Sequence, residues 1–170
     1  MAIRDVRNQT AWVFTGNPET VNEQTDYAPG QLGSIVTING KKYQRVQMDS
    51  GSSNGITAAD KVVTFWKNSV NSLVTADLRF SEGGRNTPAG VLHCAVTDGY
   101  LCFVQKGGRS TIKTGGTPAI GDVAVANSGT AADVTPITAG SAPTYLKVGV
   151  YTSTASGSVA SIDLMLDDNL

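Results

Sequence analysis

Short runs of alternating apolar and polar residues, separated by glycine-rich turns, recur along most of the chain. The clearest example follows Leu32, where the dipeptide Asn39-Gly40 separates a strand-like run at 34–38 from an alternating run at 41–48. Alternation with a period of two is typical of strands, and Asn-Gly accepts the positive φ angles of a tight turn. These residues therefore predict a β-hairpin.

A second hairpin is predicted within Ala89–Lys113, where two apolar runs flank Asp98-Gly99. Asp-Gly suits a two-residue turn for the same reason as Asn-Gly. A two-residue turn would place Cys94 opposite Phe103, whereas a three-residue loop would place Cys94 opposite Cys102. Two reduced, partly buried thiols are the favoured interpretation, because a free cysteine behaves as a small hydrophobic residue.

Further strand-like runs lie at 61–66, 120–126, 145–151 and 159–166, and the run 73–80 is either a strand or a short helix. Stretches rich in glycine, serine or proline, such as 81–88, predict loops between them. Short strands of this number and spacing predict an all-β fold, either a compact β-barrel or a β-sandwich of short antiparallel strands. We expect residues 32–170 to form a single β-rich domain.

The first 31 residues, Met1–Gln31, are polar and irregular. They predict either an extended N-terminal arm that reaches a neighbouring chain, or an ordinary first strand followed by a long loop. Trp12, Phe14 and Tyr27 lie in this part of the chain. Because Trp and Tyr are enriched at the centres of interfaces, these aromatic residues are candidate contacts with a partner, and filling the core is the alternative.

Composition narrows the choice of partners. The chain has 170 residues, of which only 16% are charged, and its formal net charge is −1 with no basic patch, so nucleic acid is not expected as a direct partner. No apolar run approaches the roughly 18 residues of a membrane span. The N-terminal stretch also lacks the apolar core of a secretory signal, so we expect synthesis in a cytoplasm.

Few residues offer chemistry. His93 is the one histidine, which excludes sites that need two. His93 and Cys94 are adjacent, so a strand would point them to opposite faces, away from a shared metal ion. A dyad of Cys102 with His93 remains an alternative. The sequence contains no P-loop or GxGxxG motif, and its single GxSxG match, Gly51–Gly55, lies in a Gly/Ser-rich turn region without the context of a nucleophile elbow. We therefore predict no catalytic residue, no metal site and no cofactor, and not an enzyme.

The C-terminal half carries a longer pattern. It consists of an Ala-Gly-Val run, a turn with threonine, glycine and tyrosine, a Phe-Val-Gln strand followed by glycine, a Gly-Asp turn and a closing pair of strands. The residues are Ala89, Gly90, Val91, Thr97, Gly99, Tyr100, Phe103, Val104, Gln105, Gly108, Ile112, Lys113, Gly121, Asp122, Val148, Gly149 and Val150. In this pattern the chain resembles the decoration, or cement, proteins of tailed-bacteriophage heads. The run 32–52 also resembles the leading strand pair of phage structural proteins.

The resemblance implies an accessory β-domain, without catalytic residues or a cofactor, that binds the exterior of an icosahedral head. The implied partners are the major capsid protein and further copies of this chain, as a trimer or a dimer. The implied location is the outer surface of the virion, after synthesis in the host cytoplasm. Trp12, Phe14 and Tyr27 then become candidate contacts with the capsid or with a neighbouring subunit.

Two alternatives stay open. The chain is another phage structural protein, such as a tail-tube, head-completion or fibre-associated domain, or it is a β-fold hydrolase or carbohydrate-binding module. The low aromatic content, 6%, argues mildly against carbohydrate binding, which relies on stacking.

Overall fold

The computed structural model describes residues 17–21, 32–49, 62–67, 73–75, 84–126, 134–138, 140–141 and 147–166. These residues form ten strands and one short 3₁₀-helix, with no α-helix among them. The helix is η2 (Pro18–Thr20). The strands are β1 (Ile35–Ile38), β2 (Lys41–Met48), β3 (Val62–Lys67), β4 (Leu73–Thr75), β5 (Gly84–Leu92), β6 (Leu101–Lys113), β7 (Val123–Ala126), β8 (Val134–Ile137), β9 (Lys147–Tyr151) and β10 (Val159–Met165).

All ten strands belong to one sheet, in the order β1-β2-β4-β3-β5-β6-β10-β9-β7-β8. Neighbouring strands are antiparallel, except that β2 and β4 are parallel. The predicted all-β class with antiparallel strands is therefore confirmed. The sheet order is open, with β1 and β8 at its ends, and the choice between barrel and sandwich stays a prediction.

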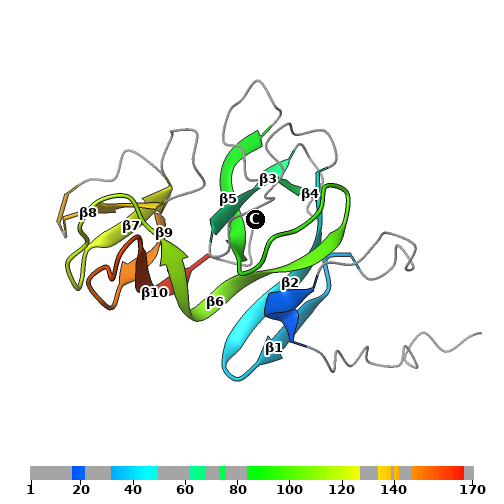
Figure 1. Cartoon of the computed structure of the whole chain (residues 1–170), viewed down its shortest axis with the longest axis horizontal. Coiled ribbons are helices and arrows are strands. Elements are labelled where there is room, and N and C mark those ends of the chain that lie inside the picture. Colours follow the sequence, from blue (N-terminus) through cyan, green and yellow to red (C-terminus); the bar gives the residue numbers. More distant parts are fainter. Residues whose placement is uncertain are drawn as a thin grey trace, which may run out of the picture.

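The long strand β6 connects two groups of strands, as Figure 1 shows. On one side, β2 pairs with β6 as well as with β4, so the pairing runs through β2, β4, β3, β5 and β6 and returns to β2. On the other side, β6 pairs with β10, and β9, β7 and β8 follow. An isolated bridge between Thr114 and Val134 brings the chain just after β6 back to β8.

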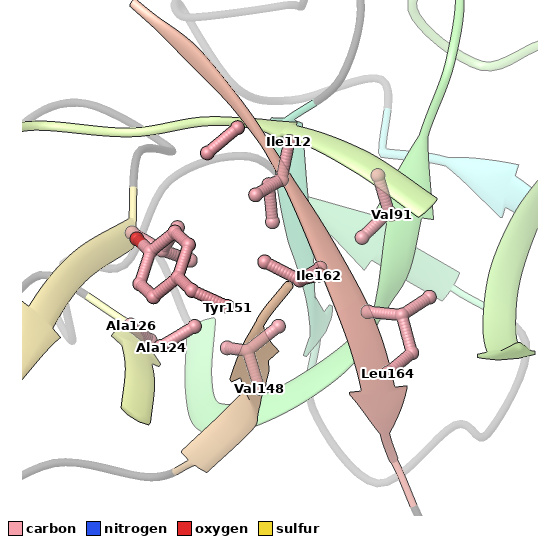
Figure 2. Packing of buried hydrophobic residues seen from close by; sticks show 10 residues of the cluster. Val91, Ile112, Ala124, Ala126, Val148, Tyr151, Ile162 and Leu164 are labelled. Atoms are coloured by element: carbon pink, nitrogen blue, oxygen red, sulfur yellow. The ribbon is translucent and has the colours of Figure 1, made fainter. Parts of the chain in front are cut away.

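Each group of strands has its own buried cluster. The first cluster fills the group around β2 and β5, and comprises Val46, Met48, Trp66, Val74, Ala89, Leu92, Val96, Cys102 and Val104. The second, drawn in Figure 2, comprises Val91, Ile112, Ala124, Ala126, Val134, Val148, Tyr151, Ala160, Ile162 and Leu164. The strand β6 contributes to both, because it carries buried residues along most of its length.

The hairpin predicted at Asn39-Gly40 is confirmed. The strands β1 and β2 pair up to Ile38 and Lys41, which leaves a two-residue turn. Both turn residues have positive φ, 52° for Asn39 and 75° for Gly40. This is the conformation that Asn-Gly favours, and its twist matches that of the flanking strands.

The hairpin predicted at Asp98-Gly99 is only half right. A turn does form there, because the Tyr100 amide donates to the Thr97 carbonyl at 3.0 Å. The flanking strands, however, end at Leu92 and begin at Leu101, so eight residues connect them and the predicted two-residue hairpin is wrong. The turn packs instead against the end of β2, where Gly99 and Tyr100 exchange backbone hydrogen bonds with Met48. A long-range contact thus replaces the local ladder.

The loop predicted at 81–88 is also partly wrong, since β5 begins at Gly84. The proline in this stretch does not end the strand. The pairing of β5 with β3 skips one residue between Pro88 and Gly90, which is a β-bulge. Bulges are among the few places where a paired strand tolerates proline.

Two glycines of the phage-like pattern lie where strands approach closely. A Cβ atom on Gly90 would lie 2.7 Å from Cβ of Val104 in β6. A Cβ atom on Gly149 would collide with the backbone carbonyl of Asp163 in β10. Glycine is the residue that lets strand backbones approach this closely, so both positions shape the scaffold.

Candidate functional site

The predicted contact residues Trp12, Phe14 and Tyr27 lie outside the described residues. Five residues of the predicted N-terminal arm are described, Asn17–Val21, and we call them the anchor segment. They lie against β2 and β6 of the same chain. The anchor segment is thus the described part of the predicted contact region.

Local signals shape the anchor segment. Asn17 has extended φ and ψ angles, and its side chain accepts a hydrogen bond from the Glu19 amide at 3.0 Å. Pro18 follows at the first position of η2, where its missing N–H costs nothing. The Thr20 amide and hydroxyl both donate to the Asn17 carbonyl. This turn presents Glu19 toward β2.

Glu19 forms the polar half of the contact. Its Oε1 accepts a hydrogen bond from Nζ of Lys41 at 2.8 Å and another from the Tyr43 hydroxyl at 2.7 Å. Lys41 and Tyr43 are two residues apart on β2, so they share one face of the strand. The Glu19 side chain is 30% exposed and that of Lys41 is 34% exposed, so this is a half-buried ion pair.

Val21 forms the apolar half. It is buried together with Tyr43 and Phe103, and Val36 and Ile38 pack against the same cluster. The Val21 carbonyl also faces Sγ of Cys94, at 3.8 Å. The anchor segment is therefore fixed by a charge pair at one end and by an apolar contact at the other.

An open hollow of about 520 Å³ lies beside the ion pair. Its lining is Asn17, Pro18, Glu19, Ile38, Asn39, Lys41 and Tyr43. The charged groups in it already pair with each other. The arrangement is thus suited to holding the anchor segment on the β1–β2 hairpin.

The contact shifts the pKa values of both partners of the hydrogen bond. Burial alone would raise the pKa of Glu19, but the hydrogen bonds from Lys41 and Tyr43 and the positive charges of His93 and Lys41 lower it overall. Burial and the negative charge of Glu19 raise the pKa of Tyr43 far above its usual value. The carboxylate and the neutral phenol are the forms that the contact stabilises.

His93 lies directly after β5, in contact with two polar side chains. Its Nε2 is 2.8 Å from Oε1 of Gln105 and 3.3 Å from Oγ of Ser110. The hydrogen-bond pattern assigns the proton to Nε2, because Gln105 uses its amide nitrogen to donate elsewhere and offers its oxygen as acceptor. Nε2 is therefore not placed to take a proton from Ser110.

Gln105 has a structural role. The pairing of β2 with β6 skips one residue after it, so β6 bulges there. The fully buried Gln105 amide donates to the Gly107 carbonyl at 3.0 Å and to the Arg109 carbonyl at 3.1 Å. The Gln105 side chain thus ties two carbonyl groups that directly follow the bulge. The Gln-x-x-Gly part of the phage-like pattern thus describes a clamped bulge, with Gly108 at a φ of 81°.

Both cysteines are free thiols. Cys94 is half-buried, whereas Cys102 is fully buried in the first cluster. Burial raises the pKa of both thiols, and that of Cys102 far more. A buried thiol with a raised pKa is a poor nucleophile, so the geometry does not favour a dyad of Cys102 with His93.

No three His, Cys, Asp or Glu side chains in the described ranges gather closely enough to hold a metal ion. In the same part of the chain, no helix has the length and apolar character needed to cross a membrane. A comparison with protein-family models finds no match for this chain, and a comparison with curated proteins finds none either.

Glu19 and Lys41 were not among the predicted site residues. One signal was available, since Asn17-Pro18-Glu19 is a typical start of a helical turn, with a capping asparagine and proline at the first position. A local motif could not predict the partners of Glu19, because Lys41 and Tyr43 are more than twenty residues further along the chain.

Proposed function

We propose that this chain is a virion structural protein that binds the outer surface of an assembled bacteriophage head and stabilises the capsid, as decoration proteins do. The observation that supports the proposal is the resemblance of the C-terminal half, together with the roles of the residues that carry it. Gly90 and Gly149 permit close strand contacts, and Gln105 and Gly108 shape the bulge of β6. Because these residues shape the scaffold, a resemblance that they carry supports a scaffold similar to that of decoration proteins.

The physical basis of the proposed function is linkage. A ligand that binds the assembled shell better than its free subunits stabilises the shell by the free energy of that binding. Many copies that bind side by side gain avidity, so each single contact can be modest. A β-scaffold with a fixed docking region is sufficient for this role, and no catalytic group is needed.

The anchor segment lies between the aromatic residues that we propose as contacts with the phage head. In the sequence, Trp12 and Phe14 precede it and Tyr27 follows it. Because the anchor segment is fixed on β2 and β6, residues on both sides of it start from a defined position on the sheet. Such preorganisation lowers the entropy that is lost when a flanking residue binds a partner.

Co-sedimentation with heads tests the proposal. We expect the purified chain to pellet with mature heads in a saturable manner, not to pellet with immature heads, and to raise the temperature at which mature heads disrupt. Trp12→Ala is expected to weaken this binding, and Asp163→Asn, which changes an exposed carboxylate on β10, is the control. A chain that binds neither form of head contradicts the proposal, and a location in the tail of purified particles favours another phage structural role.

A further inference from the structure

The turn between β1 and β2 carries the dipeptide Asn39-Gly40 at the protein surface (Figure 1). Both residues are exposed, and the pairing of the two strands ends at Ile38 and Lys41. The Gly40 amide nitrogen therefore lies outside the ladder of hydrogen bonds. A Cβ atom on Gly40 would meet no atom within 4 Å, so the space beside its backbone is open. The turn thus leaves the Asn39 side chain and the Gly40 backbone accessible to water.

An asparagine that precedes a glycine can react with its own backbone. The glycine nitrogen attacks Cγ of the asparagine, and ammonia leaves with the proton of that nitrogen as a succinimide ring closes. Water then opens the ring: breaking the new bond to Cγ gives aspartate, and breaking the original peptide bond gives isoaspartate. Glycine favours the attack, because no side chain obstructs its nitrogen and its backbone rotates readily. Either route replaces a neutral amide with a carboxylate and consumes only water.

A carboxylate at position 39 would lie beside the contact of the anchor segment. Asn39 lines the same hollow as Glu19 and Lys41, whose charged groups pair at 2.8 Å. A second carboxylate there would repel Glu19 and compete with it for Lys41. The site that receives Glu19 would then offer Lys41 together with a negative charge, instead of Lys41 alone. Deamidation of Asn39 therefore opposes the binding of the anchor segment to β2.

Isoaspartate has a further effect, because it changes the length of the turn. Its backbone runs through Cγ, which adds one carbon atom between positions 39 and 40. The observed turn has exactly two residues between the paired Ile38 and Lys41. Its Gly40 carbonyl also lies against β6, since a Cβ atom on Gly108 would be 2.7 Å from that oxygen. A longer turn does not fit between these constraints, so isoaspartate disturbs the hairpin that carries Lys41.

We propose that Asn39 is a site of spontaneous deamidation, and that the carboxylate formed there weakens the contact of the anchor segment with β2. The contact then loosens as the protein ages, in one direction only, because the ammonia that leaves is not returned. Loosening of the anchor segment also uncovers Cys94, whose Sγ faces the Val21 carbonyl at 3.8 Å. The reaction needs no partner, so it does not depend on whether the chain binds phage heads.

Peptide mapping by mass spectrometry tests the modification. The folded full chain is incubated at mildly alkaline pH until Asn39 has converted in a parallel sample that is kept unfolded in urea. We expect the peptide that contains Asn39 to convert in the folded sample as well, with the mass gain of OH over NH2 and with separate aspartate and isoaspartate forms. An Asn39 that is still fully intact in the folded chain at that time overturns the proposal.

Two substitutions test the consequence. Asn39→Asp introduces the carboxylate without lengthening the backbone, and Asn39→Gly removes the side chain but keeps a dipeptide that suits this turn. We expect Asn39→Asp to raise the rate at which Cys94 reacts with a thiol reagent about twofold or more, the order of effect of one half-exposed charge pair. Asn39→Gly should leave that rate unchanged. In a Glu19→Gln background, Asn39→Asp should cause no further rise, because the charge that it repels is absent.

Circular dichroism checks that each variant folds, and Cys102 is fully buried, so the early reaction reports on Cys94. A selective rise in Asn39→Asp that disappears with Glu19→Gln supports the proposal. Three results contradict it: an unchanged rate in Asn39→Asp, an equal rise in Asn39→Gly, or a rise that persists in the Glu19→Gln background.

Discussion

The Glu19 contact predicts a measurable coupling between the anchor segment and β2. The ion pair of Glu19 with Lys41 is half-buried, and such a pair contributes about 0.5–1 kcal/mol. The hydrogen bond from the Tyr43 hydroxyl has a charged acceptor, which is typically worth about 1.5–3 kcal/mol. Glu19→Gln keeps an acceptor oxygen and removes the charge, so we expect it to lower the free energy of unfolding by about 0.5–1 kcal/mol. Glu19→Ala removes both and should cost about 2–3 kcal/mol.

A double-mutant cycle with Glu19→Gln and Lys41→Met, measured by urea denaturation at neutral pH, isolates the charge pair. The matched control is the Arg109–Asp163 pair, whose side chains are 72% and 53% exposed with a separation of 3.4 Å. At that exposure we expect a coupling near zero. Equal coupling in both cycles, or none at Glu19, would refute the assignment of the contact.

The pH dependence gives a second test of the same contact. The folded state lowers the pKa of Glu19, so the folded protein binds this proton less readily than the unfolded chain does. The stabilisation is therefore complete above the unfolded pKa of about 4.3 and is lost as the pH falls through the lower folded pKa. The stability difference between the wild type and Glu19→Gln should shrink over that acidic range. A difference that stays constant down to strongly acidic pH would contradict the pKa direction.

Three further predictions concern the scaffold and the thiols. Gly149→Ala places a methyl group against the backbone of β10 and should destabilise by about 1–3 kcal/mol or more. The control is Gly115→Ala, whose added methyl group meets open space and should change stability by less than about 0.5 kcal/mol. Thermal denaturation of both variants measures the difference. Gln105→Leu removes the side-chain hydrogen bonds to the Gly107 and Arg109 carbonyl groups and should lower the free energy of unfolding in urea by about 2–4 kcal/mol. A loss below about 1 kcal/mol would argue against a structural role of these bonds. With a thiol reagent, Cys94 should react slowly in the folded protein, and its rate should rise at alkaline pH as the thiolate forms. Cys102 should react only after unfolding. Equal reaction rates of the two thiols would contradict the difference in their burial.

The sequence was sufficient where the structure depends on neighbouring residues. The Asn39-Gly40 hairpin formed as predicted because the turn residues and the flanking alternation specify the same register. The strands at 61–66, 145–151 and 159–166 were found within two residues of their predicted starts, at Val62, Lys147 and Val159. In these cases the local preference and the tertiary contacts agree.

The sequence was insufficient where distant residues decide the local structure. Asp98-Gly99 forms its turn against Met48 and not within a continuous ladder. The strand β6 continues through Gly107 and Gly108, where it pairs with Met165 and Leu164 of β10, more than fifty residues further along the chain. The same limit applies to Glu19, whose partners are known only once β2 lies beside the anchor segment.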